Sequence, residues 1–216
     1  MRTGSIVALA ALMAVSPACR SSSPVLVRLD MPGISAFPAG AFGEIIVAGF
    51  RNEAAVPDLD PAHELQSYLA AELRRAFKGP VSLRTLPDGA TALPAIWREA
   101  GAGRDRPIFL TGSVRLESQI RKALQKGSVP VDGPFKLAGR GLIEQRHWAL
   151  SVDLIVIAGE TGEPLFRRTY REDRDYIDLE KPADFAFSEL SARFRDRLFP
   201  TLLGSPTTEQ RTLLTR

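Results

Sequence analysis

The fold of this chain is decided by a short stretch of sequence, Glu44–Phe50, which reads EIIVAGF. Its apolar run contains three consecutive β-branched residues, Ile45, Ile46 and Val47. A continuous apolar run of this length is typical of a strand that is covered on one or both faces. We therefore expect this stretch to be the central strand of a sheet against which other elements pack.

A helix is predicted directly after this strand. Asp60 followed by Pro61 is typical of an N-cap and a first helical position, where the missing N–H of proline costs nothing. Apolar residues then recur at helical spacing, and Gly79-Pro80 ends the pattern. The residues of this stripe are Leu65, Tyr68, Leu69, Leu73, Ala76 and Phe77. One face of the helix is therefore expected to be buried.

The remaining sequence predicts four more strands and two more helices. The expected strands are 81–86, 107–117, 148–157 and 165–170, and the expected helices are 93–100 and a last one that begins near residue 184 and ends at Pro200. This order indicates an α/β fold of the α+β type, with a mixed sheet, an antiparallel meander of the later strands and amphipathic helices packed on the sheet. Residues 44–203 are expected to form a single domain, followed by a flexible tail at 204–216.

A polar insertion, residues 121–141, interrupts the pattern of strands. It contains several glycines and prolines and is expected to be a mobile loop. Arg121, Lys122 and Lys126 are our candidates for contact with an anion or an acidic partner, because mobile loops often carry recognition. Without such a partner, these side chains would form only a solvated surface.

The first 18 residues are typical of a secretory signal peptide, with one charge at Arg2 and an uncharged apolar run from Ile6 to Val15. This run is about half of the roughly 20 residues that a membrane-spanning helix needs. The cut would leave the only cysteine, Cys19, as the first residue of the mature chain. Residues 19–43 would then form a tether.

This arrangement resembles a bacterial lipobox, and the resemblance implies that Cys19 is lipidated and holds the protein on a membrane. Arg20 stands where inner-membrane retention would require Asp, which favours the outer membrane, facing the periplasm. The sequence departs from the usual lipobox at Ser16, where Leu is preferred. The alternative is cleavage by ordinary signal peptidase, which would leave a soluble periplasmic protein with a free thiol.

The composition excludes several classes of protein. Among 216 residues there are 28 Lys and Arg, 25 Asp and Glu and one cysteine. A single cysteine excludes an intrachain disulfide framework, and the near balance of charge gives no reason to expect a nucleic-acid partner. No Asp, Glu or Cys lies at a spacing from His63 or His147 that would suit a shared metal ion, and both histidines are expected at surface or boundary positions. No serine lies in the Gly-x-Ser-x-Gly motif that would indicate a nucleophile. We therefore expect no catalytic residue, no metal and no cofactor.

Four segments, 45–52, 110–114, 152–157 and 161–163, together resemble the superfamily of periplasmic lipoproteins that includes the curli secretion lipoprotein and the activator of penicillin-binding proteins. The resemblance implies a non-catalytic binding or accessory component of an envelope assembly or transport system, with a protein partner in the envelope. The chain shows no evident long pore-forming hairpin insertion, which argues against a secretion channel. The alternatives are a lipoprotein of the lipopolysaccharide-assembly type and a soluble periplasmic enzyme, and the oligomeric state stays open.

Overall fold

The structure is a computed structural model of the chain, and it describes residues 23–31, 34–38, 40–85, 93–126, 140–204 and 207–215. The chain divides into two units. The larger is Pro32–Thr207, and the smaller combines Met1–Met31 with Thr208–Arg216. The predicted signal peptide and Cys19 lie outside the described residues.

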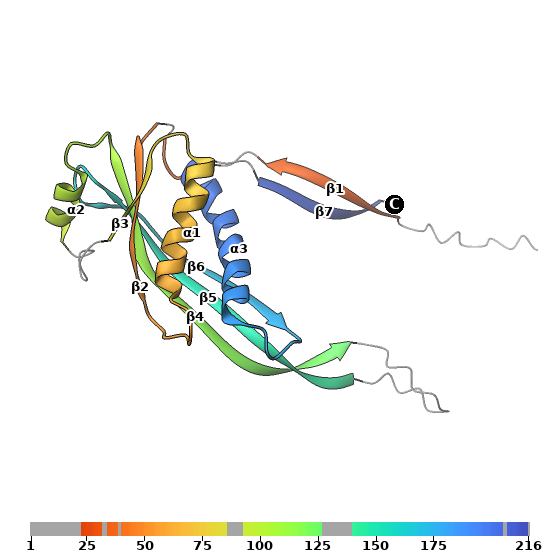
Figure 1. Cartoon of the computed structure of the whole chain (residues 1–216). Coiled ribbons are helices and arrows are strands. Elements are labelled where there is room, and N and C mark those ends of the chain that lie inside the picture. The colour runs from red at the N-terminus through yellow and green to blue at the C-terminus, as the bar shows by residue number, and fades with distance from the viewer. Residues whose placement is uncertain are drawn as a thin grey trace, which may run out of the picture. The chain divides into compact units, whose positions relative to one another are not determined.

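The larger unit is built on a five-stranded mixed sheet in the order β3-β2-β4-β5-β6 (Figure 1). Strand β2 (Glu44–Asn52) pairs in parallel with β3 (Val81–Arg84) and with β4 (Pro107–Lys126). Strands β4, β5 (Arg140–Ala158) and β6 (Pro164–Tyr176) pair antiparallel. The prediction of a mixed sheet with a later antiparallel meander is therefore confirmed.

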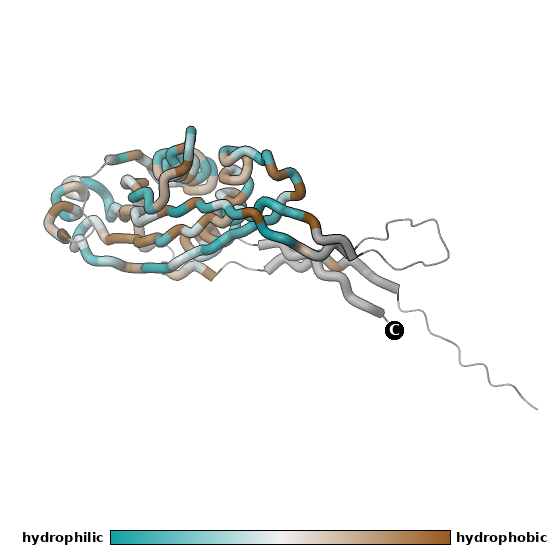
Figure 2. Tube along the Cα trace, turned by 90° about the horizontal axis from the view of Figure 1, so that it is seen from below, coloured by the Kyte–Doolittle hydropathy of each residue, from teal (hydrophilic) through white to brown (hydrophobic). Residues whose placement is uncertain are grey.

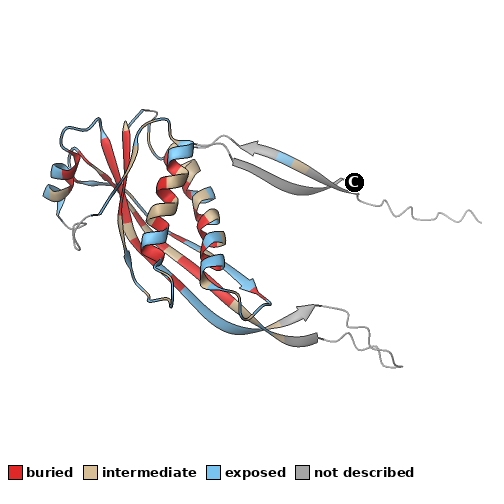
Figure 3. Ribbon diagram, in the orientation of Figure 1, coloured by how far each residue is buried: buried red, intermediate tan, exposed pale blue. Residues whose placement is uncertain are grey.

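Helices α1 (Pro61–Ala76) and α3 (Ala183–Leu203) cover one face of this sheet, and their buried residues face the strands (Figures 1 and 3). The cap of α1 is as predicted, since the Asp60 carboxylate accepts a hydrogen bond from the Ala62 N–H at 3.1 Å. Of the predicted stripe, Leu65, Leu69 and Leu73 have no exposed area, whereas Tyr68 and Phe77 are half-buried and Ala76 is exposed. We call this face of the sheet the helix side.

The opposite face carries a smaller apolar layer under helix α2 (Pro94–Gly101). Its centre is Trp97, whose ring centroid lies 5.0 Å from that of Phe109 on β4. Ile46 and Ala48 of the central strand contribute to this layer, while Ile45 and Val47 face the helix side. The two clusters explain why the opening stretch is apolar at consecutive positions: each face of β2 is covered.

Strands β4 and β5 are longer than the sequence predicts. Hydrophobic and hydrophilic positions alternate along the strands (Figure 2). The last pair between β2 and β4 is Asn52 with Val114, and the pairing of β5 with β6 ends at Arg146 with Tyr176. Beyond both, residues 121–126 pair only with 140–145. We call this two-stranded ladder the hairpin arm (Figure 1).

The hairpin arm corrects two expectations. Residues 121–126 and 140–141 were expected in a mobile loop, but they are strand, and their register with the rest of β4 and β5 is unbroken. The pair of β4 and β5 is also a long hairpin, whose length the sequence did not predict. None of the arm's side chains that the structure describes is buried, so the arm lacks the stripe that would have indicated a strand.

Helix α3 continues past Pro200, the residue at which the sequence predicts its end. Leu198 and Leu202 lie one turn apart and are each only 1% exposed, so the buried stripe continues across the proline. The helix ends at Gly204, which has a φ of 67° and donates its N–H to the Pro200 carbonyl at 3.1 Å. Burial of the stripe therefore outweighs the hydrogen bond that proline removes.

Residues ahead of β2 are also ordered against α3. The Ala36 N–H donates to the Thr201 carbonyl at 2.7 Å, and the Ser35 hydroxyl donates to the carbonyls of Thr201 and Leu202. This part of the expected tether, residues 19–43, therefore belongs to the folded unit.

The smaller unit, taken by itself, is a two-stranded sheet of β1 (Ser23–Met31) and β7 (Thr207–Thr215). Residues 207–215 fall in the segment that was expected to be a flexible tail, and they are strand instead. A strand at this position was not predicted because its sequence, TTEQRTLLT, has no clear alternation of apolar residues.

Candidate functional site

A hollow of about 650 Å³ lies beside β4 at the point where β2 has ended. We call it the edge groove. It is lined by residues 54–57, 116–119, 121, 146–149, 171 and 180–183. Because neighbouring residues of a strand point to opposite faces, these lining residues come from both faces of the β4–β5 pair. The groove therefore wraps around the edge of β4.

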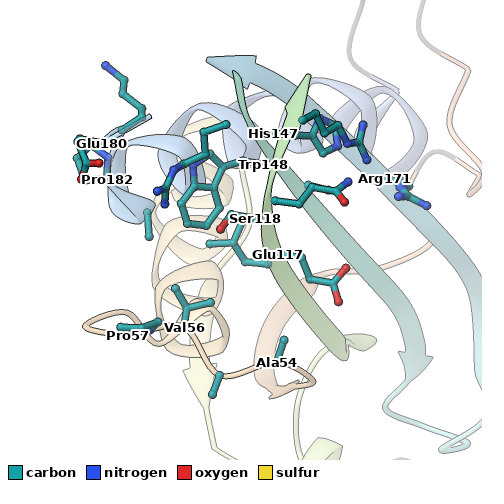
Figure 4. Close-up of a pocket in the computed structure, with 18 residues that line it drawn as sticks. Ala54, Val56, Pro57, Glu117, Ser118, His147, Trp148, Arg171, Glu180 and Pro182 are labelled. Carbon is teal, nitrogen blue, oxygen red and sulfur yellow. The ribbon is translucent and has the colours of Figure 1, made fainter. Parts of the chain in front are cut away.

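The wall on the helix side is formed around Trp148, with Val56 and Pro57 from the loop before α1 and Pro182 from the start of α3 (Figure 4). Trp148 is 5% exposed. Its Nε1–H and the Nε–H of Arg146 are both buried without a hydrogen-bond partner. A buried donor without an acceptor is costly, and both of these donors belong to residues that line the groove.

The wall on the opposite face contains His147 and Arg171 (Figure 4). His147 is 4% exposed, and its Nδ1 lies 2.7 Å from a carboxylate oxygen of Asp175, directly across the β5–β6 ladder. The expectation of a surface or boundary position for His147 is therefore wrong, whereas His63 is exposed in the first turn of α1. A carboxylate at Nδ1 fixes the orientation of the imidazole ring.

Ion pairs lie on this same face of the sheet, at the point where β2 ends and the edge of β4 becomes unpaired. Glu53 accepts from Arg51 at 3.3 Å and lies 3.5 Å from Arg115, which also pairs with Glu117 at 3.4 Å. The Ser113 hydroxyl, followed by the guanidinium groups of Arg51 and Arg115, holds the pKa of Glu53 below its ordinary value against a smaller opposing effect of burial. These charges keep one rim of the edge groove solvated.

Lys181 forms part of another rim, near the beginning of α3. Its Nζ lies 3.9 Å from the ring centroid of Phe185 and 6.0 Å from that of Tyr176. Burial raises the pKa of Tyr176, whose hydroxyl donates to Glu189 at 2.8 Å. In the part of the chain that the structure describes, no group of three or more His, Cys, Asp and Glu side chains could hold a metal ion.

The three basic residues predicted as a contact site lie on β4 and not in a loop. Arg121 and Lys122 are exposed, and Lys126 is the last residue of the strand. Arg121 lines the edge groove, but its neighbour Lys122 points to the other face. The structure therefore does not bring Arg121 and Lys122 to one face of the strand. Their role in binding stays a prediction.

Sequence reasoning missed Trp148, Arg146 and the pair of His147 with Asp175. All four lie on strands, and the register of the β4–β5–β6 meander determines which of them are neighbours. A signal for Trp148 was present, because an aromatic residue at the start of an apolar strand usually packs against something.

Comparison with known proteins gives similarity of structure only. No protein-family profile matches the chain, and no curated protein matches it in sequence. The PelC dodecamer of Paraburkholderia phytofirmans has a TM-score of 0.41 and 16% identity, over 83% of this chain and 98% of that one. The hypothetical protein CT253 of Chlamydia trachomatis has a TM-score of 0.44 and 10% identity, over 76% and 99%.

A minor lipoprotein of Acinetobacter baumannii is a third similar structure, with a TM-score of 0.33 and 11% identity, over 73% of this chain and 93% of that one. Bacterial lipoproteins are thus among the proteins that this chain is similar to. At these identities and TM-scores, the similarities carry no argument about what the chain does. No helix among the described residues is long and apolar enough to cross a bilayer.

Proposed function

We propose that this protein is a lipid-anchored accessory component of the bacterial envelope, held through Cys19 on the outer membrane and facing the periplasm, that binds a protein partner without catalysis. The membrane part of the proposal rests on the leader and on the position of Cys19 directly after it. The partner part rests on the hairpin arm and the edge groove.

The observation that carries the partner part is the hairpin arm. An isolated two-stranded ladder is only marginally stable, and this one leaves both outer edges of its backbone unpaired among the described residues. Its sequence is basic, with four Lys and Arg residues against one Glu over 121–126 and 140–145. An acidic partner would neutralise this charge and cover the ladder.

A finer assignment, to the superfamily of the curli secretion lipoprotein and the activator of penicillin-binding proteins, is part of this proposal. It is supported by the order of the elements, in which a buried strand and a capped helix precede a meander whose last turn contains Thr161 and Gly162.

The anchor is tested by changing Cys19 to Ala and separating membranes from the soluble periplasmic fraction. We expect the natural chain in the membrane fraction and the variant in the soluble one, because two or more acyl chains hold a protein on a bilayer and none remain in the variant. A variant that stays with the membranes would show that something else anchors the protein.

The partner is tested by reversing Arg121, Lys122 and Lys126 together to Glu and crosslinking in intact cells. We expect the crosslinked complex to be lost while thermal stability is retained, since both described side chains of this set are exposed. The matched control reverses three exposed basic residues elsewhere, Lys78, Arg98 and Arg167.

An unchanged complex in the first triple variant would exclude the arm as the contact. A hydrolytic activity that is lost in His147→Ala would overturn the proposal that the protein is not an enzyme, because the pair of His147 with Asp175 is the arrangement a general base would need.

A further inference from the structure

The edge of β4 that faces the groove has unpaired backbone groups. The Pro107 carbonyl accepts from the Gly159 N–H at 2.8 Å on the β5 side, whereas the Val114 carbonyl accepts from the Glu53 N–H at 2.9 Å on the β2 side. Backbone groups alternate in direction along a strand, and the β4–β5 register has no bulge. Leu116, Ser118 and Ile120 therefore point their N–H and C=O groups away from β5.

No described strand pairs with these groups. After Glu53, the chain leaves the sheet through residues 54–59 and begins α1, so β2 does not continue beside β4. The edge groove occupies the vacated position, and its lining from both faces of β4 is what an added strand would contact, because the side chains of that strand would alternate between the same two faces.

The groove also offers specific donors to such a strand. In the register of β4 and β5, Trp148 lies opposite Ser118, and Arg146 lies opposite Ile120. The two residues that carry the buried N–H groups without a partner therefore lie one strand in from the free edge, with their side chains on the helix side. A carboxylate is the side chain that accepts from both an indole and a guanidinium group.

Charge around the groove favours the same ligand. Four basic side chains line it, Arg121, Arg146, Arg171 and Lys181, against the two acidic residues Glu117 and Glu180. The excess of positive charge would attract an acidic segment and repel a basic one.

We infer that the edge groove binds an extended, acidic segment of a partner protein, which adds to the sheet as a strand beside Leu116–Ile120 and directs a carboxylate toward the Nε1–H of Trp148 and the Nε–H of Arg146. This inference deepens the proposed function and rests on its claim that the chain binds a protein. It names the mode of binding and the chemistry of the bound segment.

The probe is a random library of short peptides displayed on phage and selected on the full chain purified in detergent. We expect the enriched peptides to alternate β-branched residues with Asp or Glu. Enrichment of basic peptides, of peptides with helical spacing of apolar residues, or of none at all would overturn the inference.

The protein variant that tests strand addition is Ser118→Pro, with Ser118→Ala as its matched control. Proline removes an N–H that points away from β5, so the β4–β5 ladder is retained, whereas alanine removes only the hydroxyl. We expect an enriched acidic peptide to bind the proline variant about tenfold more weakly, which is the effect of one or two hydrogen bonds. The alanine variant should bind like the natural chain.

A test on the peptide side does not depend on the folding of a variant. N-methylation at alternate amides, in the two possible registers, should abolish binding in one register and leave it in the other, because only every second N–H of an added strand faces β4. Equal effects of both registers would overturn strand addition.

The acceptor is tested with Trp148→Phe, which keeps an aromatic ring but removes the N–H. The natural chain should prefer a peptide with Glu over the same peptide with Gln, and the variant should lose most of this preference. An undiminished preference would exclude Trp148 as a donor. If all peptide tests fail but charge reversal on the arm still removes the crosslinked complex, strand addition is wrong and the proposed partner binding stands.

Discussion

The two halves of β4 differ in how they are paired and in how far their side chains are buried. From Pro107 to Val114 the strand is paired on both sides and every residue but Gly112 is buried. From Glu117 to Lys122 it is paired on one side only, and every residue is exposed. Both halves have the same backbone geometry and the same partner, β5.

This difference shows that one strand serves two purposes. Its first half contributes stability, because Leu110 and Phe109 bury their side chains in the two apolar layers. Its second half contributes little to the core and keeps backbone groups and charges available to solvent or to a ligand. We therefore expect substitutions in the first half to act on folding and those in the second half to act on binding.

The largest effect is expected for Gly112→Ala, at the centre of the buried half. Gly112 has a φ of 149°, and a Cβ there would lie 1.7 Å from the Asp153 carbonyl oxygen. Backbone strain and overpacking together should lower the free energy of unfolding by roughly 2–6 kcal/mol, as measured by urea denaturation. Gly49→Ala on β2 is the matched control, since a Cβ there meets nothing within 4 Å.

A comparable but smaller loss is expected for Leu110→Ala in the buried half, and almost none for Ile120→Ala in the exposed half. Leu110 has no exposed area, and its truncation should cost about 2–5 kcal/mol. Ile120 is 57% exposed, and its truncation should change the free energy of unfolding by at most about 0.5 kcal/mol. Similar losses in the two variants would contradict the division of β4 into two halves.

The smallest effect concerns Glu53, at the boundary between the halves. Because its pKa is lowered in the folded chain, its stabilisation is present above the ordinary carboxyl range and is lost as the pH falls through the folded pKa. The natural chain should exceed Glu53→Gln in stability by less than about 1 kcal/mol at about pH 7, and the difference should shrink as the pH falls through the carboxyl range. A difference that grows toward acid pH would have the wrong sign.

The parts of the fold that the sequence predicts well are those in which side-chain burial determines the structure. The apolar run at 45–48 predicts the central strand because both of its faces are covered, and Asp60 with Pro61 marks the beginning of α1 because a cap is a local feature. The hairpin arm could not be recognised in the same way, because none of its described side chains is buried. The prediction that α3 ends at Pro200 is wrong, because tertiary packing of Leu198 and Leu202 stabilises the helix beyond the proline.

The candidate site was missed for a different reason, which is register. Near the turn, Ile157 pairs with Pro164, and a regular ladder from that pair would place His147 opposite Arg174. A shift between Val156 and Ile157 moves the pairing by one residue and places His147 opposite Asp175. A shift of this kind leaves no mark in the sequence, so the pairing of the imidazole with a carboxylate follows only from the structure.

The contacts of Ser35 and Ala36 with the last turn of α3 have a consequence for the connectivity of the larger unit. They place the residues just after Pro32 beside those just before Gly204, so the polypeptide enters and leaves this unit at one place. A short linker between residues 204 and 34 would therefore close the backbone without stretching it, and new ends could be opened at the turn of residues 159–162. The larger unit should accordingly tolerate circular permutation, with its sheet and both helices of the helix side retained.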